Sequence, residues 1–196
     1  MVLPERKLES FEEFIVRFPY AKEVMIDGTE RPIQRPKDQE KQKSHYSGKK
    51  KRHTRKHLVM TDQDKRVLVL TKARVGKVHD KKQLDEEELV DFVPDEVPIH
   101  VDLGFQGLQR EFVNIKIPDK KPRGKELSEE QKQSNREKSC DVFDNPFGER
   151  VKCEHTIAGI KRYNAATALY RNRIEDLDDR FMLIAAGLWN FYLMAA

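Results

Sequence analysis

The stretch that most constrains the fold is Ile99–Leu108, where a short apolar run ends at Asp102 and passes into a segment with two glycines. This pattern is typical of a buried strand that runs out into a loop. A carboxylate at the end of a buried strand is costly unless it is hydrogen-bonded, paired or bound to a metal. Asp102 therefore either caps the turn through Gly104 and Gly107 or belongs to a functional site. This stretch alone leaves both alternatives open.

The chain has 196 residues, which is enough for one domain with a hydrophobic core. We expect a lead-in segment over residues 1–20 and one main domain over residues 21–196. The two cysteines, Cys140 and Cys153, do not make a disulfide framework, which favours a cytoplasmic location. No apolar stretch approaches the ~20 residues that span a bilayer, so no membrane association is expected.

Five segments have the apolar runs and turn boundaries of strands. The first begins at Val24–Ile26 and reaches Asp27-Gly28, a pair that also suits a hairpin turn. Pro32 and Pro36 fit poorly in a returning strand, which favours a single strand that carries Asp27 on its face. The other four predicted strands are Thr54–Thr61, Arg66–Thr71, the run that begins at Ile99, and Phe112–Ile117.

Helical spacing of apolar residues, together with capping residues, predicts helices around these strands. For His79 and Asp80 we favour a role at the start of a helix over catalysis. Strands and helices in this order predict an α/β fold with a mixed five-stranded sheet flanked by helices. The predicted helices are one within Leu8–Pro19, with Ser10 as its cap and Pro19 as its end, Lys81–Phe92 after the cap Asp80, Ser128 to about Ser139, Glu149–Ala168, and an apolar core helix capped by Asp176 or Asp178.

The positive charge of the chain is concentrated in two segments. A charge run is usually a solvated segment, but the first of these contains a Tyr-Ser-Gly turn and lies between two predicted strands. That context favours contact with phosphate groups. The first segment, Arg35–His57, includes Lys49, Lys50, Lys51 and Arg52, and the second, Pro118–Lys125, includes Lys120, Lys121 and Arg123.

Three carboxylates can share one site if the fold places two strands side by side with a helix over their ends. Asp27 and Asp102 lie on predicted strands, and Glu154 lies on a predicted helix. Arg150, Glu154 and Lys161 fall at intervals of four and seven, so they share one helix face. An ordinary charged face with an Arg150–Glu154 pair is the alternative. Carboxylates suit Mg²⁺ or Mn²⁺, and two such ions can activate water for phosphodiester cleavage.

An ordered set of motifs supports this hypothesis. Its core consists of Asp27-Gly28-Thr29-Glu30, Asp102-Leu103-Gly104-Phe105-Gln106-Gly107 and Cys153-Glu154-His155, accompanied by Tyr46-Ser47-Gly48, Gly76 with His79-Asp80, and Gly187-Leu188-Trp189-Asn190. In this order the motifs resemble the catalytic domain of a DDE-type insertion-sequence transposase. The resemblance implies a ribonuclease-H-like fold and cut-and-paste DNA transposition, with transposon ends and target DNA as partners and a nucleoid-associated location.

The resemblance also assigns roles to single residues. It implies that Asp27, Asp102 and Glu154 are the catalytic residues and hold two Mg²⁺ or Mn²⁺ ions. Arg150 and Lys161 would orient Glu154 or contact phosphate. Related transposases often carry the pattern Tyr-x2-Arg-x3-Glu-x6-Lys around the last acid. Here Phe147 stands at the tyrosine position, so a hydroxyl contact to DNA is expected to be missing.

The short segment before Val24 leads to a further expectation. Such transposases usually have an N-terminal helix-turn-helix region that finds the element's ends, and we expect this chain to lack it. A separately encoded helix-turn-helix subunit and a homodimer are expected partners. The alternative function is a truncated, non-catalytic DNA-binding remnant. A zinc site of Cys140, Cys153 and His155 is disfavoured, because the cysteines lack a close paired spacing.

Overall fold

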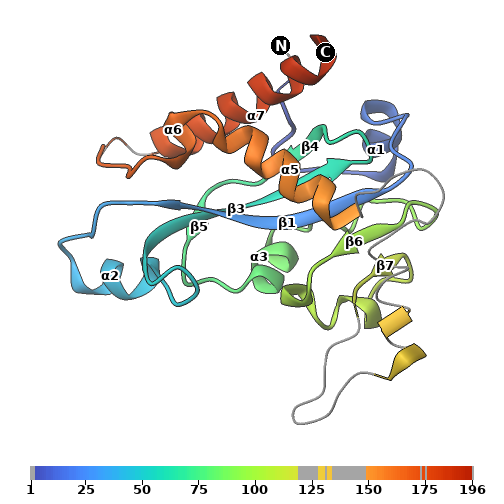
Figure 1. Cartoon of the computed structure of the whole chain (residues 1–196), viewed down its shortest axis with the longest axis horizontal. Helices are drawn as coiled ribbons and strands as arrows, with labels where there is room; N and C mark the ends of the chain where they lie inside the picture. The colour runs from blue at the N-terminus through green and yellow to red at the C-terminus, as the bar shows by residue number, and fades with distance from the viewer. Residues whose placement is uncertain are drawn as a thin grey trace.

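The computed structural model describes residues 3–118, 128–130, 132–133, 149–172, 174 and 176–195, without the side chains of residues 149–151. A mixed sheet lies at the centre, with helices on both faces (Figure 1). The helices are α1 (Phe11–Arg17), α2 (Gln39–His45), α3 (Asp80–Glu86), α5 (Glu149–Lys161), α6 (Asn164–Thr167) and α7 (Leu177–Ala195), with the 3-10 turns η1 (Leu103–Phe105) and η2 (Leu108–Arg110). The strands are β1 (Val24–Pro32), β2 (Tyr46–Ser47), β3 (Arg52–Asp62), β4 (Val67–Leu70), β5 (Arg74–Val75), β6 (Ile99–Val101) and β7 (Ile115–Lys116).

The sheet has the order β2-β3-β1-β6-β7, and β4 and β5 both pair with β3. β1 is antiparallel to β3 and parallel to β6, which is parallel to β7. All five predicted strands are present, as β1, β3, β4, β6 and β7. The predicted number of five strands is nevertheless too low. β2 and β5 have only two residues each, so they carry no alternation that a sequence pattern can show.

The pairing of β1 with β3 settles the backbone conformation at Asp27. The two strands are paired without interruption from Val24↔Asp62 to Pro32↔Thr54, and Asp27 pairs with Val59. The alternative of a hairpin turn at Asp27-Gly28 is therefore wrong, and one continuous strand carries Asp27. Pro32 is the last residue of β1, a position at which a strand tolerates a missing N–H.

Two hydrophobic clusters lie on opposite faces of the sheet, as the alternation of side chains along a strand requires. Leu58 of β3 belongs to the cluster that α1 and α3 cover, and the next residue, Val59, belongs to the cluster that α5, α6 and α7 cover. Trp189 of α7 is buried in the second cluster, which confirms the predicted core role of the last helix. Among the described helices, none is both long and apolar enough to cross a membrane.

Three predicted helices, α1, α3 and α5, are shorter than expected, and the largest differences are at the ends of α3 and α5. α3 ends at Glu86 rather than Phe92, because Glu88 has a left-handed backbone (φ 49°) and the chain then turns Leu89 into the core. α5 does not continue to Ala168. It ends at Lys161, Tyr163 is extended and packs on the second cluster, and α6 follows as a separate short helix.

The other helices are predicted unevenly. α1 begins after Ser10, whose hydroxyl oxygen accepts a hydrogen bond from the N–H of Glu13 (3.1 Å), as expected of its cap. α2 is not among the predicted helices; it lies within the basic segment and is capped by the carboxylate of Asp38. The helix expected from Ser128 to about Ser139 falls mostly outside the described residues.

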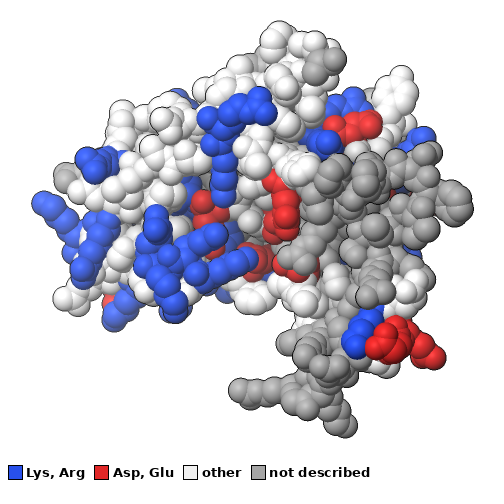
Figure 2. Space-filling view, viewed as in Figure 1, with Lys and Arg blue, Asp and Glu red and all other residues white. Residues whose placement is uncertain are grey.

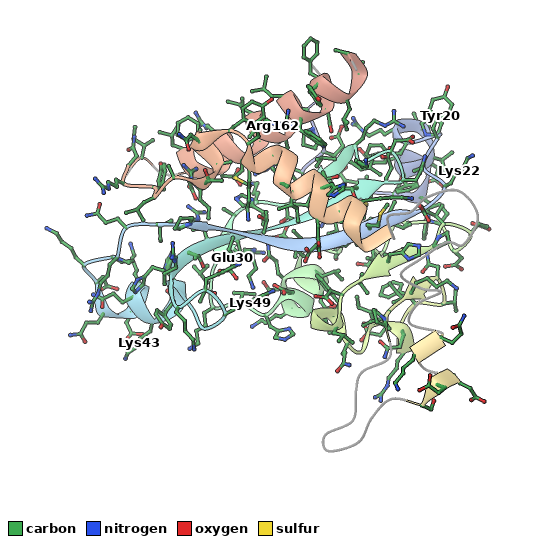
Figure 3. All side chains as sticks on the ribbon, in the orientation of Figure 1. Tyr20, Lys22, Glu30, Lys43, Lys49 and Arg162 are labelled. Atoms are coloured by element: carbon green, nitrogen blue, oxygen red, sulfur yellow. The ribbon has the colours of Figure 1, made fainter. Side chains whose placement is uncertain are left out.

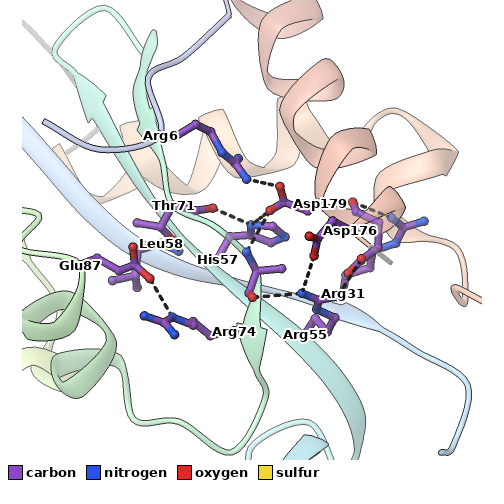
Figure 4. Close-up of polar contacts among 12 residues, drawn as sticks. Arg6, Arg31, Arg55, His57, Leu58, Thr71, Arg74, Glu87, Asp176 and Asp179 are labelled. Atoms are coloured by element: carbon purple, nitrogen blue, oxygen red, sulfur yellow. Dashed lines mark hydrogen bonds and ion pairs between the residues drawn. The ribbon is translucent and has the colours of Figure 1, made fainter. Parts of the chain in front are cut away.

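A polar network joins the start of α7 to β1 and β3 (Figure 4). The buried Arg31 donates to the backbone carbonyl of Asp178 (3.1 Å), and Arg55 donates to the Asp178 carboxylate (3.0 Å). Arg6 pairs with Asp179, the next residue of α7. Arg55 therefore joins β3 to α7, although it belongs to the basic segment that is expected to contact phosphate.

His57 lies within this network and makes the stability of the fold depend on pH. Its side chain is fully buried, its Nδ1 lies 3.0 Å from the carbonyl oxygen of Thr71, and burial lowers its pKa below the usual 6.5. The folded chain thus keeps the imidazole neutral, while the unfolded chain binds a proton below about pH 6.5. We expect this contribution to stability to be fully present above about pH 6.5 and to fall by up to about 1.4 kcal/mol per pH unit below it.

Urea unfolding at several pH values between about 7 and 5 measures this slope. His57→Gln is expected to flatten the slope, because glutamine binds no proton. The exposed His79 offers a matched control, and His79→Gln should keep the slope of the unsubstituted chain. Equal slopes in all three proteins would contradict the prediction.

Candidate functional site

Asp27 and Asp102 are brought together by the register of two parallel strands. β1 and β6 are paired at Val24↔Ile99, Met25↔His100 and Ile26↔Val101. Asp27 and Asp102 each directly follow the last of these pairs. Neighbouring strands lie about 4.8 Å apart, so the two carboxylates start from adjacent backbones.

Each of these carboxylates accepts a hydrogen bond from the next backbone N–H. Asp27 Oδ1 lies 2.6 Å from the nitrogen of Gly28, and Asp102 Oδ1 lies 2.7 Å from the nitrogen of Leu103. Asp102 is the cap residue of η1, so the capping alternative for this residue is correct. The capping role is compatible with a role in a functional site, because Asp102 lines the same cleft as Asp27.

Glu154 reaches this cleft from α5. Glu154, Ile157 and Lys161 line it from one face of the helix, as the spacing of Glu154 and Lys161 predicts. The side chain of Arg150 is not described, so its predicted role and its alternative pairing with Glu154 stay predictions. Phe147 lies outside the described residues.

We call this hollow the acidic cleft. It opens beside β1 where β6 has ended, and acidic side chains lie near the centre of this face with Lys and Arg side chains beside them (Figure 2). Carboxylates suit cations, and the bordering lysines suit an anionic substrate. The acidic cleft is lined by Asp27, Gly28, Glu30, Lys49, Lys50, Lys56, Asp80, Asp102, Glu154, Ile157, Ala158 and Lys161.

Two of the lysines at the border of the acidic cleft, Lys49 and Lys50, belong to a tight turn between β2 and β3. The strands pair at Ser47↔Arg52, and the turn lies between these two residues. Lys49 and Lys50 are exposed and line the cleft, and Lys51 and Arg52 are exposed at the same turn. Figure 3 shows Lys49 and Glu30 on the same side of β1, toward α3. The predicted contact residues of the second basic loop, Lys120, Lys121 and Arg123, lie outside the described residues.

Burial and neighbouring charges shift two pKa values in the acidic cleft. Burial raises the pKa of Asp27; Asp102 and Asp80 add to the rise, while the N–H of Gly28 and the charge of Lys49 oppose it. Burial also lowers the pKa of Lys161. A partly buried carboxylate beside other carboxylates gains from a nearby cation, so the donor set fits a divalent metal ion.

The described residues do not contain a finished metal site. No three His, Cys, Asp or Glu side chains among them are already placed to hold one ion. Cys153, from the disfavoured zinc site, is 3% exposed, and burial raises the pKa of its thiol to about 12. A thiol buried in this way is typical of a structural, unreactive cysteine. Cys140 lies outside the described residues.

Glu30, Lys56 and Asp80 line the acidic cleft although the sequence analysis does not include them among the site residues. The predicted capping role of Asp80 is wrong. His79 occupies the cap position of α3, and the carboxylate of Asp80 accepts a hydrogen bond from Lys56 Nζ (2.6 Å) instead. The motif of Gly76 with His79-Asp80 draws attention to Asp80, but no local sequence pattern predicts its ion pair with Lys56 of β3.

Comparison with known proteins identifies the family. A family model described as DDE superfamily endonuclease matches residues 26–190, which include Asp27, Asp102 and Glu154. The chain belongs to this family. The probable transposase for insertion sequence element IS702 of Microchaete diplosiphon is 34% identical over 171 residues, which cover 87% of this chain and 57% of the relative. The chain thus spans little more than half the length of that protein. No solved structure matches the present chain.

These findings confirm the resemblance to transposases that the motifs indicate.

Proposed function

We propose that this DDE superfamily endonuclease cleaves DNA phosphodiester bonds and transfers the cut strands in cut-and-paste transposition, with Asp27, Asp102 and Glu154 as catalytic residues. The observation that carries the proposal is the placement of Asp27 and Asp102 after the last β1–β6 pair, in a cleft that Glu154 also lines. The antiparallel strands β1, β3 and β4, followed by the parallel strands β6 and β7, support a ribonuclease-H-like fold.

Two Mg²⁺ or Mn²⁺ ions are the proposed cofactors, since hard cations of this size prefer oxygen ligands. Asp27, Asp102 and Glu154 would hold them. When bound, such ions activate a water and stabilise the leaving oxygen of a phosphodiester. The chain's own contribution is to hold the three carboxylates at one cleft and to place the ammonium group of Lys161 beside them.

The basic side chains around the acidic cleft are the proposed contacts to the DNA backbone. The exposed turn at Lys49–Arg52 and Lys161 supply positive charge at the border of the cleft. Phosphate contacts of this kind orient DNA without reading its sequence. The relative is a probable transposase for an insertion sequence element, which makes the ends of such an element the proposed substrate.

Nicking of supercoiled plasmid DNA tests the proposed function. The 196-residue chain is incubated with plasmid in Mg²⁺, in Mn²⁺ or in a chelator, and the nicked form is quantified. We expect nicking with either ion and none with the chelator. DNA binding without nicking in both ions would instead favour a non-catalytic DNA-binding remnant.

Replacing Lys49, Lys50 and Lys51 together with alanine should weaken binding to all DNA sequences alike. For duplex DNA, each lost phosphate contact lowers the slope of log affinity against log salt by about 0.9, so the slope should fall by about 2–3. Fluorescence anisotropy with two unrelated duplexes at several salt concentrations measures both effects.

The matched control removes three exposed lysines that do not line the acidic cleft, namely Lys7, Lys22 and Lys72. Lys22 lies beside α1, ahead of β1 (Figure 3). This control removes the same total charge and should keep most of the salt dependence. A loss confined to one of the two duplexes would show base readout at the turn and contradict the prediction.

A further inference from the structure

Asp80 lies against the backbone next to both proposed catalytic aspartates. A Cβ atom built on Gly28 would lie 3.2 Å from Asp80 Oδ1, and one built on Gly104 would lie 3.3 Å from Asp80 Oδ2. Gly28 directly follows Asp27, and Gly104 lies two residues after Asp102. The two oxygens of one carboxylate therefore face the two segments that carry the aspartates.

Lys56 holds Asp80 in this position. Its Nζ lies 2.6 Å from Asp80 Oδ1 and 2.8 Å from the carbonyl oxygen of Val78, and the residue is 7% exposed. Charge-assisted hydrogen bonds between largely buried groups are strong, and removing one partner leaves the other uncompensated. Lys56 belongs to β3, which is paired along the whole of β1. The position of Asp80 is thus tied to the centre of the sheet.

The ladder between β1 and β6 does not extend to the aspartates themselves. Its last pair is Ile26↔Val101. After this pair β1 continues along β3, while the segment that follows β6 turns into η1. The paired segment ends at this point, and just beyond it the Asp80 carboxylate lies within 3.2–3.3 Å of the positions that Cβ atoms on Gly28 and Gly104 would take. Glycine at positions 28 and 104 therefore lets the Asp80 carboxylate approach both segments more closely than a residue with a Cβ atom would comfortably allow.

We propose that Asp80 is a positioning residue that, held by Lys56, sets the separation of Asp27 and Asp102. The expected effect on metal binding rests on the proposed function, whereas the spacing itself rests only on the contacts described above. In this arrangement, Asp80 supports the backbone beneath both aspartates and keeps them from moving apart or together.

Two substitutions of Asp80 distinguish a role as a spacer between the two segments from a role as a charged metal ligand. Asp80→Ala removes the spacer, whereas Asp80→Asn keeps its size and an oxygen that accepts the hydrogen bond from Lys56. Mn²⁺ affinity is measured by titration calorimetry on the folded chain. We expect Asp80→Ala to weaken this affinity about 10–100-fold, as loss of support for metal ligands typically does. Asp80→Asn should recover most of the loss, and Asp85→Asn, an exposed acid on the same helix, should bind as the unsubstituted chain does.

Hydrogen exchange supplies a readout that needs no metal. The amides of Gly28 and Leu103 are bonded to the two aspartate side chains, so their exchange reports on local spacing. Asp80→Ala should speed the exchange of both amides. The amide of Leu58, which is bonded to Thr71 in the core, should keep its protection.

The outcomes distinguish this inference from the proposed function. Unchanged Mn²⁺ affinity and unchanged exchange in Asp80→Ala would overturn the inference and leave the proposed function standing. Equal losses of Mn²⁺ affinity in Asp80→Asn and Asp80→Ala would show that the charge of Asp80 binds the metal, and would overturn its proposed role as a spacer. If the unsubstituted chain bound no Mn²⁺, the proposed function would fail, while faster exchange in Asp80→Ala would still support the spacer.

Discussion

Replacing Asp27, Asp102 or Glu154 with the matching amide is expected to abolish metal-dependent DNA cleavage without unfolding the chain. An amide has nearly the size of the acid, and at position 27 it can still accept the hydrogen bond from the N–H of Gly28. It lacks the charge that binds a hard cation, however. Losing several kcal/mol of transition-state stabilisation corresponds to a rate reduction of about 10³-fold or more.

Plasmid nicking in Mn²⁺ measures the activity, and thermal unfolding measures the stability of each variant. We expect Asp27→Asn to unfold at the same or a higher temperature, because burial and neighbouring acids disfavour the charged form of Asp27. Loss of activity together with retained stability would locate the defect in the site rather than in the fold.

Glu30→Gln is the matched control within the same cleft. Glu30 lines the acidic cleft, and its carboxylate accepts a hydrogen bond from the hydroxyl of Thr54 (2.6 Å), which a glutamine oxygen can also accept. This variant should keep most of the activity. An equal loss in Glu30→Gln would mean that the overall negative charge of the cleft matters, and not the three named carboxylates.

Gly159→Ala is expected to destabilise the fold by about 1–3 kcal/mol, the usual cost of overpacking a core. A Cβ atom on Gly159 would lie 2.3 Å from Cε3 of Trp189, far inside contact distance. The ring has little freedom to move, because Trp189 is 6% exposed and its indole N–H donates to the carbonyl of Lys65 (2.9 Å). The added methyl group must therefore push α5 away from α7.

Urea unfolding measures the cost, and Gly48→Ala serves as the matched glycine control, because no atom lies within 4 Å of a Cβ built there. In the background of Trp189→Leu, which removes the ring, Gly159→Ala should cost less than it does alone. Glu154 lies on α5 as well, so Gly159→Ala should also slow plasmid nicking. A cost as small as that of Gly48→Ala would contradict the packing of α5 on α7.

The sequence predicts features that depend on neighbouring residues along the chain. The apolar runs at Val24, Leu58, Val67 and Ile99 predict strands because alternation and turn residues are local signals. The same signals place Asp27 on a strand and Asp102 at the end of another. Their joint location at one cleft is an expectation from the sequence, and the register of β1 with β6 supplies its physical reason.

Features that depend on contacts across the fold are not predictable in this way. The pairing of Asp80 with Lys56 requires β3 to lie beside α3, and the sequence alone favours a cap at Asp80 because a helix follows it. The end of α5 is misplaced for a similar reason. Tyr163 has no local signal to leave the helix, but the second cluster offers it a packing site.

The order of the site residues along the chain has a consequence during synthesis. A ribosome that has completed the chain from β1 to η1 has made both aspartates, whereas Glu154 follows more than fifty residues later (154 − 102 = 52). The helix that supports α5, with Trp189 against Gly159, is made later still. A nascent or prematurely terminated chain therefore carries two of the three proposed carboxylates without the third held in place. Under the proposed function, such a fragment would lack the complete set of carboxylates that metal-dependent cleavage requires.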